Sequence, residues 1–424
     1  MAQEFSLPES AVTLYNLHVP GPLVGERAAL VNTSLTLENG KFSSEPAATR
    51  IDGGGRMALP AFVDMHTHLD KGHIWPRKPN PDGTFAGALS SVGEDRTANW
   101  SSDDVRTRME FALHSAYAQG SKAIRTHLDS IPPQHEISWP VFAELREKWA
   151  GKVELQAVCL VGAEGVDAEG EGAYGPVADV TMDHGGILGM VPYPLPDIEA
   201  RIANIFRMAT ERDSELDFHV DETGDPTVNT LKLIAKEAIR TGFERPIVVG
   251  HCCSLSVMPE SEADETMDLV AKAGIHVVSL PMCNLYLQDR DPGRTPRWRG
   301  VTLVHELKAR GVKVSFASDN TRDPFYAFGD LDMVEVMREA TRIAHLDHTT
   351  DDWVEAFTSI PASVCGFEHQ PFKTGAPADF TLFSARSWNE FFSRPQADRT
   401  VIRNGVALTE KPLPFSQLDP LMEM

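Results

Sequence analysis

The 424-residue chain has few cysteines, a deficit of basic residues and no long apolar run. Its five cysteines are an odd number and include no Cys-x-x-Cys pair, so neither a disulfide framework nor a cysteine-based structural zinc site is indicated. No run of 18 apolar residues occurs, and we expect no membrane-spanning helix. The first residues lack a basic stretch followed by an apolar one, which predicts a cytoplasmic location.

The charge balance bounds the partners of the protein. It has 39 Lys and Arg residues and 61 Asp and Glu residues, which gives a formal net charge of −22. Such a surface repels polyphosphate, whereas binding to a nucleic-acid duplex needs a dense basic surface. We therefore expect no nucleic acid and no membrane among its partners, and a free small molecule as substrate. The oligomeric state stays open, with a homo-oligomer as one possibility.

The two ends of the sequence resemble each other. Short β-rich runs broken by turn residues fill residues 12–58 and 376–409, and each range contains an Asn-Gly dipeptide, a strong hairpin signal. Neither end holds enough strand to be stable alone. We predict that residues 1–58 and 367–424 combine into one small composite β-sandwich domain.

Strand-like and helix-like segments alternate through the middle of the chain, as in a parallel α/β domain. The expected strands are 61–66, 122–127, 153–159, 187–192, 216–220, 246–250, 275–280 and 313–317. The expected helices include 103–118, 141–149, 198–211, 228–241, 261–273 and 302–310. Eight strands without a Gly-rich phosphate turn after the first favour a (β/α)8 TIM-like barrel over a doubly wound sheet. We predict a barrel catalytic domain over residues 59–366.

Two long connections attract attention. Residues 163–175 are Gly-rich but acidic and lack the Gly-Lys-Ser/Thr of a phosphate loop, so we expect a loop that does not bind phosphate. Residues 70–101, which include Trp75, should fold over the pocket and help to select the substrate.

His66 and His68 stand two residues apart at the end of the first expected strand. Side chains at this spacing point to the same side of a strand, so both imidazoles can face one ion. Two imidazoles suit zinc, iron or a similar divalent metal. In a (β/α)8 barrel, catalytic groups gather at these strand ends, which makes the pair a candidate metal site.

Further chemistry-bearing residues follow the ends of three later strands. These are His219 with Glu222, His251, and Asp319 with Asn320. Each alone is more often a satisfied hydrogen-bonding group than a ligand. Their arrival in register with the expected strand ends favours one shared site.

This ordered set of residues resembles the amidohydrolase superfamily, and specifically its cytosine deaminase-like branch. The segments 125–129, 281–290, 317–325 and 375–380 also resemble that branch, so that the resemblance covers nearly the whole chain. It implies a metal-dependent hydrolase that acts on C–N bonds other than peptide bonds.

The resemblance implies a role for each site residue. One divalent ion, zinc or iron, would be bound by His66, His68, His219 and Asp319. His251 would lie beside the catalytic water, Glu222 would shuttle protons, and Asp319 would also act as a base. A two-metal version needs a Lys at the end of the fourth strand, and residues 186–192 contain none.

We predict hydrolytic deamination of a small aminated N-heterocycle of the pyrimidine, pterin or triazine type. The branch's ring-reading Gln after the third strand is missing, and Val161 and Gly162 stand there. Loss of such a polar contact changes specificity strongly, which disfavours cytosine itself. The predicted substrate-binding residues are Asn320, Phe325, Val161, Gly162 and Trp75. Lys71 fits a substrate contact and a solvent-facing loop equally well.

Two alternatives stay open. The same metal site could hydrolyse a cyclic amide or an N-alkyl C–N bond. The barrel could also be catalytically silent and act as a binding protein, although every metal and shuttle position is present.

The predicted roles of His219 and Glu222 are separable. We expect His219→Ala to lose the metal, because a ligand is removed. Glu222→Gln should keep the metal and lower turnover by about 10²–10⁴-fold, because an amide cannot transfer the proton. Metal analysis together with kinetics measures both effects, and metal loss in Glu222→Gln would contradict the shuttle role.

Overall fold

The computed structural model describes residues 7–8, 10–348 and 351–422. Contacts divide the chain into two compact units. Unit 1 comprises Met1–Val63, His114–Ala123 and Leu331–Leu413, and unit 2 comprises Asp64–Leu113, Ile124–Asp330 and Pro414–Met424. The domain boundaries drawn from the sequence, after residues 58 and 366, stay a prediction. Residues 1–6, 9 and 423–424 of the predicted composite domain, and residues 349–350 of the predicted barrel domain, lie outside the described residues.

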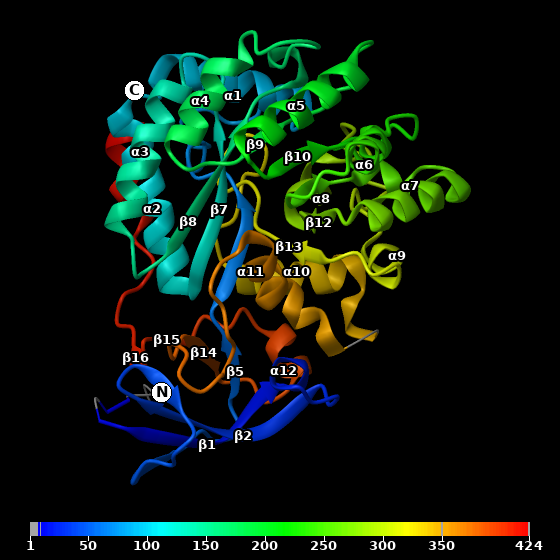
Figure 1. Ribbon diagram of the computed structural model, residues 1–424. Coiled ribbons are helices and arrows are strands. Elements are labelled where there is room, and N and C mark those ends of the chain that lie inside the picture. The colour runs from blue at the N-terminus through cyan, green and yellow to red at the C-terminus, as the bar shows by residue number, and fades with distance from the viewer. Residues whose placement is uncertain (1–6, 9, 349–350, 423–424) are drawn as a thin grey trace. The chain divides into compact units, whose positions relative to one another are not determined.

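Unit 1 is built on one eight-stranded sheet that joins both ends of the chain (Figure 1). Its strands are β1 (Val12–Pro20), β2 (Leu30–Glu38), β3 (Lys41–Ser43), β4 (Thr49–Asp52), β5 (Met57–Pro60), β14 (Phe380–Phe383), β15 (Thr400–Arg403) and β16 (Val406–Ala407). They run in the order β16-β15-β14-β5-β1-β2-β3, and β4 also pairs with β1. The antiparallel pairing of β14 with β5 joins the C-terminal strands to the N-terminal ones in one sheet, as the predicted composite β-sandwich domain requires.

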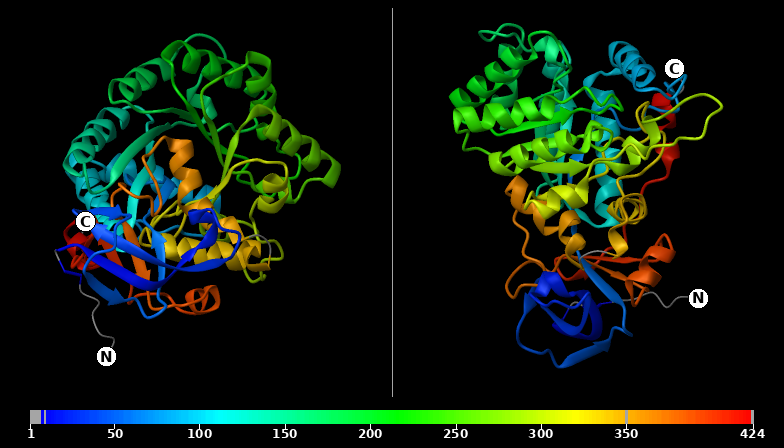
Figure 2. Two further views of the ribbon diagram at one scale, coloured as in Figure 1. Left: turned by 60° about the horizontal axis from the view of Figure 1, so that its bottom comes forward. Right: turned by 90° about the vertical axis from the view of Figure 1, so that its right-hand side faces the viewer.

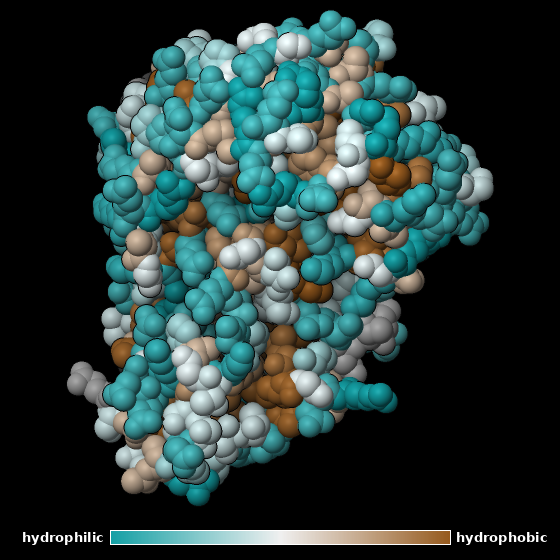
Figure 3. Space-filling view, in the orientation of Figure 1, coloured by the Kyte–Doolittle hydropathy of each residue, from teal (hydrophilic) through white to brown (hydrophobic). Residues whose placement is uncertain are grey.

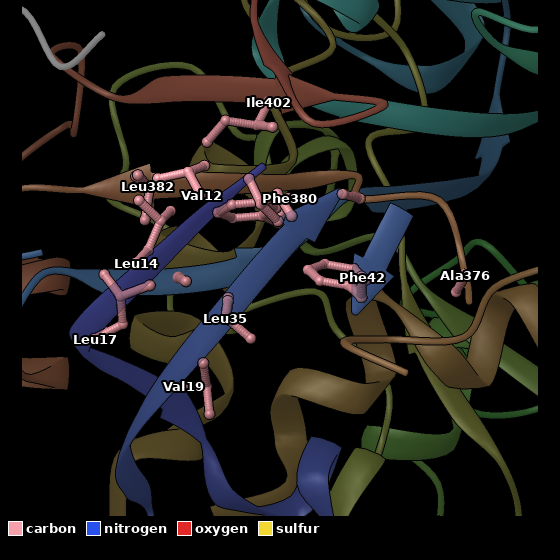
Figure 4. Close-up of a cluster of buried hydrophobic side chains, with 13 residues drawn as sticks. Val12, Leu14, Leu17, Val19, Leu35, Phe42, Ala376, Phe380, Leu382 and Ile402 are labelled. Carbon is pink, nitrogen blue, oxygen red and sulfur yellow. The ribbon is translucent and has the colours of Figure 1, made fainter. Parts of the chain in front are cut away.

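The core of this sheet is aliphatic and aromatic (Figure 4). Alternate residues of β1 and β2, such as Val12, Leu14 and Leu35, turn to one face and are buried together with Phe42 and Phe380. This period-2 pattern is the one expected of a sheet with one buried face. The helices of unit 1 include α10 (Met333–Ala344), α11 (Ser359–Cys365) and α12 (Trp388–Ser393).

Eight strands carry the expected barrel. They are β6 (Phe62–Thr67), β7 (Ser121–Asp129), β8 (Glu154–Leu160), β9 (Leu188–Met190), β10 (Leu216–Val220), β11 (Ile247–His251), β12 (His276–Ser279) and β13 (Val314–Phe316). Strands β6-β7-β8 form one sheet and β9 to β13 a second, parallel one. Parallel bridges between Val158 and Ile187 and between Thr67 and Asp319 connect the two sheets at both edges. The strands therefore follow one another round a ring, and the predicted (β/α)8 fold is confirmed.

Helices alternate with these strands and lie outside them (Figure 2). They are α1 (Phe85–Asn99), α2 (Ser102–Gln119), α3 (His135–Lys148), α4 (Tyr174–Asp183), α5 (Ile198–Arg212), α6 (Thr230–Thr241), α7 (Glu260–Ala273), α8 (Pro281–Leu287) and α9 (Val304–Ala309). In α6, Leu231, Ile234 and Ala238 lie on one buried face at helical spacing.

The segment 70–101 differs from the expected loop because it contains α1. The helix begins after Thr84, whose hydroxyl accepts a hydrogen bond from the Gly87 backbone N–H at 3.0 Å. Its buried residues include glycine and serine, so no apolar stripe indicated a helix from the sequence. Likewise α4 begins at Tyr174, within the expected loop 163–175.

Residues 414–422 belong to unit 2, although they follow the last strand of unit 1. This segment includes α13 (Asp419–Met422). The Phe415 ring packs on Phe111, with ring centroids 5.9 Å apart, and the Arg322 guanidinium lies 3.9 Å from the centre of the Phe415 ring. Arg77 donates a hydrogen bond to the Leu421 carbonyl at 3.2 Å. These contacts hold the segment against the unit that carries the candidate site.

Among the described residues, no helix has the length and apolar character needed to cross a bilayer. On the face shown in Figure 3, hydrophilic side chains predominate and hydrophobic ones are interspersed in small groups. The cytoplasmic location stays a prediction.

Gly189 in the short strand β9 gives a test of the packing in unit 2. A Cβ there would lie 2.5 Å from the Cys159 carbonyl oxygen and 2.6 Å from that of Asp217. Both are backbone atoms of neighbouring strands, so we expect Gly189→Ala to cost about 1–3 kcal/mol or more of unfolding free energy. Gly93→Ala, in helix α1 where a Cβ has space, should stabilise by about 1 kcal/mol. Denaturant unfolding measures both changes. A Gly189→Ala variant as stable as the wild type would contradict the tight packing.

Candidate active site

The predicted metal ligands come together at the ends of the barrel strands. The Nε2 atoms of His66 and His68 lie 3.6 Å and 3.1 Å from the same carboxylate oxygen, Asp319 Oδ1. The Nε2 atom of His219 lies 3.2 Å from that of His68. All four side chains are buried. Residues that are far apart in the sequence therefore direct their donor atoms at one point.

These donor atoms fit a cation. Both ring nitrogens of His66 and both carboxylate oxygens of Asp319 are buried without a hydrogen-bond partner among the described residues. Buried polar atoms are otherwise almost always paired, and a divalent ion shared by imidazole nitrogens and a carboxylate would satisfy them. Burial and neighbouring positive charges hold the pKa of His66, His68 and His219 well below the usual value. The imidazoles are thus neutral, as metal ligands must be.

The backbone of Asp319 is fixed to the first strand. Its N–H donates to the His66 carbonyl at 2.9 Å, and its own carbonyl accepts from the Thr67 hydroxyl at 2.8 Å. Asp319 has a φ of 61°, in the left-handed region, where residues other than glycine are strained and often functional. Burial raises the pKa of its carboxyl to about 7. These two hydrogen bonds thus join the end of the last strand to the first strand and place the Asp319 carboxylate between the imidazoles.

Glu222 follows β10 on a turn that is held by its neighbour. The Asp221 carboxylate accepts hydrogen bonds from the backbone N–H groups of Thr230 and Leu231, at 3.0 Å and 3.1 Å. Burial, with the nearby Asp319 charge, raises the pKa of Glu222 well above the usual value. A carboxyl that keeps its proton more readily than an exposed one suits proton transfer to a substrate.

His251 ends β11 with a φ of 68°. Its Nδ1 atom lies 3.5 Å from Glu222 Oε1, and the Asn284 amide nitrogen lies 3.0 Å from each of these two atoms. Its Nε2 atom is buried and has no hydrogen-bond partner in the described part of the chain. Burial lowers the pKa of His251 to about 3, so the ring is neutral.

A cavity of about 450 Å³ opens onto these groups. Among the predicted substrate contacts, Asn320, Phe325 and Gly162 line it. Val161 is buried and Trp75 is partly buried, and both lie outside this lining. Their contact with substrate stays a prediction. Helix α1 contributes Phe85, Leu89, Val92 and Arg96 to the wall, so the segment 70–101 does border the pocket, as expected.

Lys71 is not a solvent-facing loop residue. It is 5% exposed and lines the cavity, where its Nζ lies 2.8 Å from Asp129 Oδ1. Arg96 binds the other oxygen of the same carboxylate at 2.9 Å. The ammonium also lies 5.4 Å from the centre of the Phe325 ring. The burial of Lys71 favours the substrate-contact interpretation.

The cavity wall just beyond the end of β8 carries the carboxylate of Glu164. A Cβ on Gly162 would lie 2.4 Å from Glu164 Oε1, so the Glu164 side chain folds back over the glycine. Both residues line the cavity. This wall of the cavity is therefore acidic.

A second buried group lies beside His66. The rings of His66 and His127 are 4.1 Å apart, and His127 Nε2 lies 3.9 Å from Asp217 Oδ1. Arg125 pairs with the other Asp217 oxygen at 3.3 Å. The sequence interpretation gave these residues no role. The sequence did contain a signal for them. Arg125 and His127 stand two residues apart on one strand, and Asp217 and His219 on another, so each pair shares one side of its strand.

Gly250 controls the room available to His66. A Cβ there would lie 2.8 Å from Cε1 of the His66 ring, which already packs against the rings of His127 and His219 at centroid distances of 4.1 Å and 4.5 Å. We expect Gly250→Ala to weaken metal binding roughly 10–100-fold, as for other changes that displace a ligand from behind. Metal content after dialysis measures this, with Gly93→Ala as the control. Full retention of metal by Gly250→Ala would contradict the crowding.

Comparisons with known proteins agree with this geometry. Residues 182–409 match the amidohydrolase family. A pterin deaminase of Rhizobium rhizogenes (strain K84) is 54% identical over 86% of this chain and 84% of its own length. An N-isopropylammelide isopropyl amidohydrolase of Pseudomonas sp. (strain ADP) is 25% identical over 84% and 86%. The crystal structure of 5-methylcytosine deaminase from Klebsiella pneumoniae superposes with a TM-score of 0.79 at 22% identity, covering 95% of this chain and 99% of that one. The chain therefore belongs to the amidohydrolase family, whose members are metal-dependent hydrolases.

Proposed function

We propose that the protein is a metal-dependent deaminase of pterin-type rings. In this reaction, water replaces the amino group on the ring carbon between two ring nitrogens, giving a ring carbonyl and ammonia. The observation that carries the proposal is the convergence of His66, His68, His219 and Asp319 beside Glu222 at a cavity of about 450 Å³. The 54% identity to a protein named pterin deaminase supports this choice of ring.

We propose that His66, His68, His219 and Asp319 bind one divalent ion, zinc or iron. Three imidazoles and a carboxylate are donors that both metals accept. Bound there, such an ion would lower the pKa of a water molecule towards neutrality and provide a nucleophile at working pH. The absence of a lysine from residues 186–192 favours one ion over two.

The proton transfers fall to Glu222 and Asp319. Glu222 lines the cavity and has a raised pKa, so it can hold a proton and deliver it to the ring nitrogen beside the reacting carbon. This protonation makes the carbon more electrophilic. Asp319 can accept a proton from the attacking water and return it to the departing ammonia. General acid–base transfer of this kind contributes about 10²–10⁴-fold.

The cavity suits a flat bicyclic ring. Its volume of about 450 Å³ lies within the range of small-molecule sites. Apolar walls that include Leu160, Val92 and Phe325 can cover the faces of the ring. Lys71 and Asn320 supply hydrogen-bond donors for the oxygen and nitrogen atoms along its edges. We propose these two residues and Phe325 as substrate contacts.

One relative suggests an alternative leaving group. The name of the Pseudomonas protein indicates release of isopropylamine from an N-alkyl triazine, and the same donor atoms could serve that reaction or the opening of a cyclic amide. The products distinguish the three reactions. Deamination releases ammonia, removal of an N-alkyl group releases an alkylamine, and opening of a cyclic amide gives a ring-opened acid. A silent binding protein would release none of them. Homo-oligomerisation also stays a prediction.

We expect zinc- or iron-loaded enzyme to release one ammonia per pterin and to leave cytosine and N-isopropylammelide at least about 10²-fold less reactive. The reason is that a site shaped for one set of polar contacts discriminates against rings that leave them unpaired. Ammonia detection, with mass spectrometry of the product, measures the reaction. A chelator should abolish turnover, and added metal should restore it. Release of isopropylamine or of a ring-opened product would support the alternatives, and tight binding of pterin without turnover would support a binding protein.

A further inference from the structure

Asn284 touches two groups of the proposed machinery without lining the cavity. It lies on α8, immediately after β12, and its side chain is 1% exposed. Its amide nitrogen is 3.0 Å from Glu222 Oε1 and 3.0 Å from His251 Nδ1. A single NH₂ group therefore bridges the proposed proton shuttle and the imidazole beside the reaction centre.

The hydrogen-bonding capacity of each group fixes the direction of both bonds. An amide nitrogen donates two hydrogen bonds and accepts none. Oε1 of Glu222 accepts one of them when the carboxyl is ionised, and also when it carries its proton on Oε2. With the NH₂ group facing Glu222, its second hydrogen points at His251 Nδ1, which must accept. A neutral imidazole that accepts at Nδ1 carries its proton on Nε2. His251 therefore presents an N–H donor on its other side.

That second nitrogen is buried and has a hydrogen to donate. His251 Nε2 is buried without a hydrogen-bond partner among the described residues. One ring nitrogen each of His251, His66 and His219 lie within 4.8 Å of one another. A nitrogen that carries a hydrogen has no lone pair to give to a cation. His251 can thus orient a water or substrate oxygen by donation, while the cation is left to the four other ligands.

The bridge also separates two groups that could pair directly. Only 3.5 Å lies between His251 Nδ1 and Glu222 Oε1. Without the amide, a proton on Nδ1 would bond to the carboxylate. Nε2 would then hold a lone pair instead of a hydrogen, and Glu222 would be held by the imidazole instead of serving the substrate.

The surrounding chain holds Asn284 in place. Its backbone N–H donates to the Leu280 carbonyl at 3.0 Å, and its carbonyl accepts from the Gln288 backbone N–H at 2.9 Å. The Gln288 side chain in turn donates to the Glu222 carbonyl at 3.2 Å. A Cβ at Gly300 would lie 2.8 Å from the Asn284 carbonyl oxygen, and Gly300 has a φ of +76° that favours glycine. The segment 284–300 is thus fastened to the turn that carries Glu222.

We propose that Asn284 is a positioning residue that keeps the proton of His251 on Nε2 and keeps Glu222 available to the substrate. The inference rests on the proposed function, because it assigns Asn284 a task through Glu222 and His251. It concerns this chain's own hydrogen bonds, so the proton position can be measured without turnover.

The sharpest variant pair is Asn284→Asp and Asn284→Ala. Asp has nearly the shape of Asn but cannot donate when ionised, so it would accept from Nδ1–H of His251 and repel Glu222. Ala removes the bridge without adding a charge. We expect Asn284→Asp to lower kcat by about 10²-fold or more, within the range of lost acid–base catalysis, with KM changed less than kcat. Asn284→Ala should lower kcat by a smaller factor. A merely space-filling role gives the opposite order, because Asp fills the space and Ala does not.

The nitrogen resonances of His251 give the independent readout. In ¹⁵N-histidine-labelled, zinc-loaded enzyme, assigned by the signals lost in His251→Asn, the proton should be on Nε2 in the wild type and move to Nδ1 in Asn284→Asp. The metal content should be unchanged. Asn229→Asp is the matched control, since Asn229 bonds Thr266 at 2.9 Å and touches neither Glu222 nor His251; it should leave kinetics and resonances unaltered.

Two results would overturn the proposal: a proton on Nδ1 in the wild type, or greater damage from Asn284→Ala than from Asn284→Asp. A wild-type enzyme that binds metal but leaves pterin unchanged would instead refute the proposed function. The His251 resonances would still decide the proton position in that case.

Discussion

Two hydrogen bonds hold the backbone of Asp319 against the end of β6, and the rest of the site depends on them. They join the first strand of the ring to the segment after the last one, through the His66 carbonyl and the Thr67 hydroxyl. Because these bonds fix the Asp319 backbone against the strand that carries His66, the carboxylate cannot drift away from the imidazoles. The contacts that close the ring of strands therefore also bring the imidazoles and the Asp319 carboxylate together.

Burial sets the protonation states that such a site needs. Water is excluded from the imidazoles and the carboxyls alike, and desolvation disfavours the charged form of each. The histidines are neutral as a result. Burial raises the pKa values of the Glu222 and Asp319 carboxyls. The negative charge of Asp319 adds to the rise at Glu222, and that of Asp323 adds to the rise at Asp319. The same low polarity thus prepares one set of groups to bind a cation and another to carry protons.

The sequence predicted those parts of the molecule that depend on short-range periodicity. The pair His66 and His68 could be predicted because a strand repeats every two residues. His219, His251 and Asp319 could be predicted because each lies at or just beyond the end of an apolar strand. Helix α1 could not, because its buried face includes glycine and serine. The bridge made by Asn284 was also beyond reach, since it depends on how a short helix meets two distant strand ends. The burial of Lys71 depends on Asp129, which is likewise remote in sequence.

The position of residues 414–422 bears on how the chain is made. Unit 2 receives the contacts of Phe415 and Leu421 only after both of its other segments and all of unit 1 have been synthesised. Domains generally fold as they leave the ribosome, beginning with the N-terminal one. The Arg77 side chain can bond Leu421 only when the chain has grown by 344 further residues, and Arg322 likewise meets Phe415 only near the end of synthesis. The catalytic unit of a nascent chain thus stays incomplete at that edge until the last strand of the terminal sheet has already emerged.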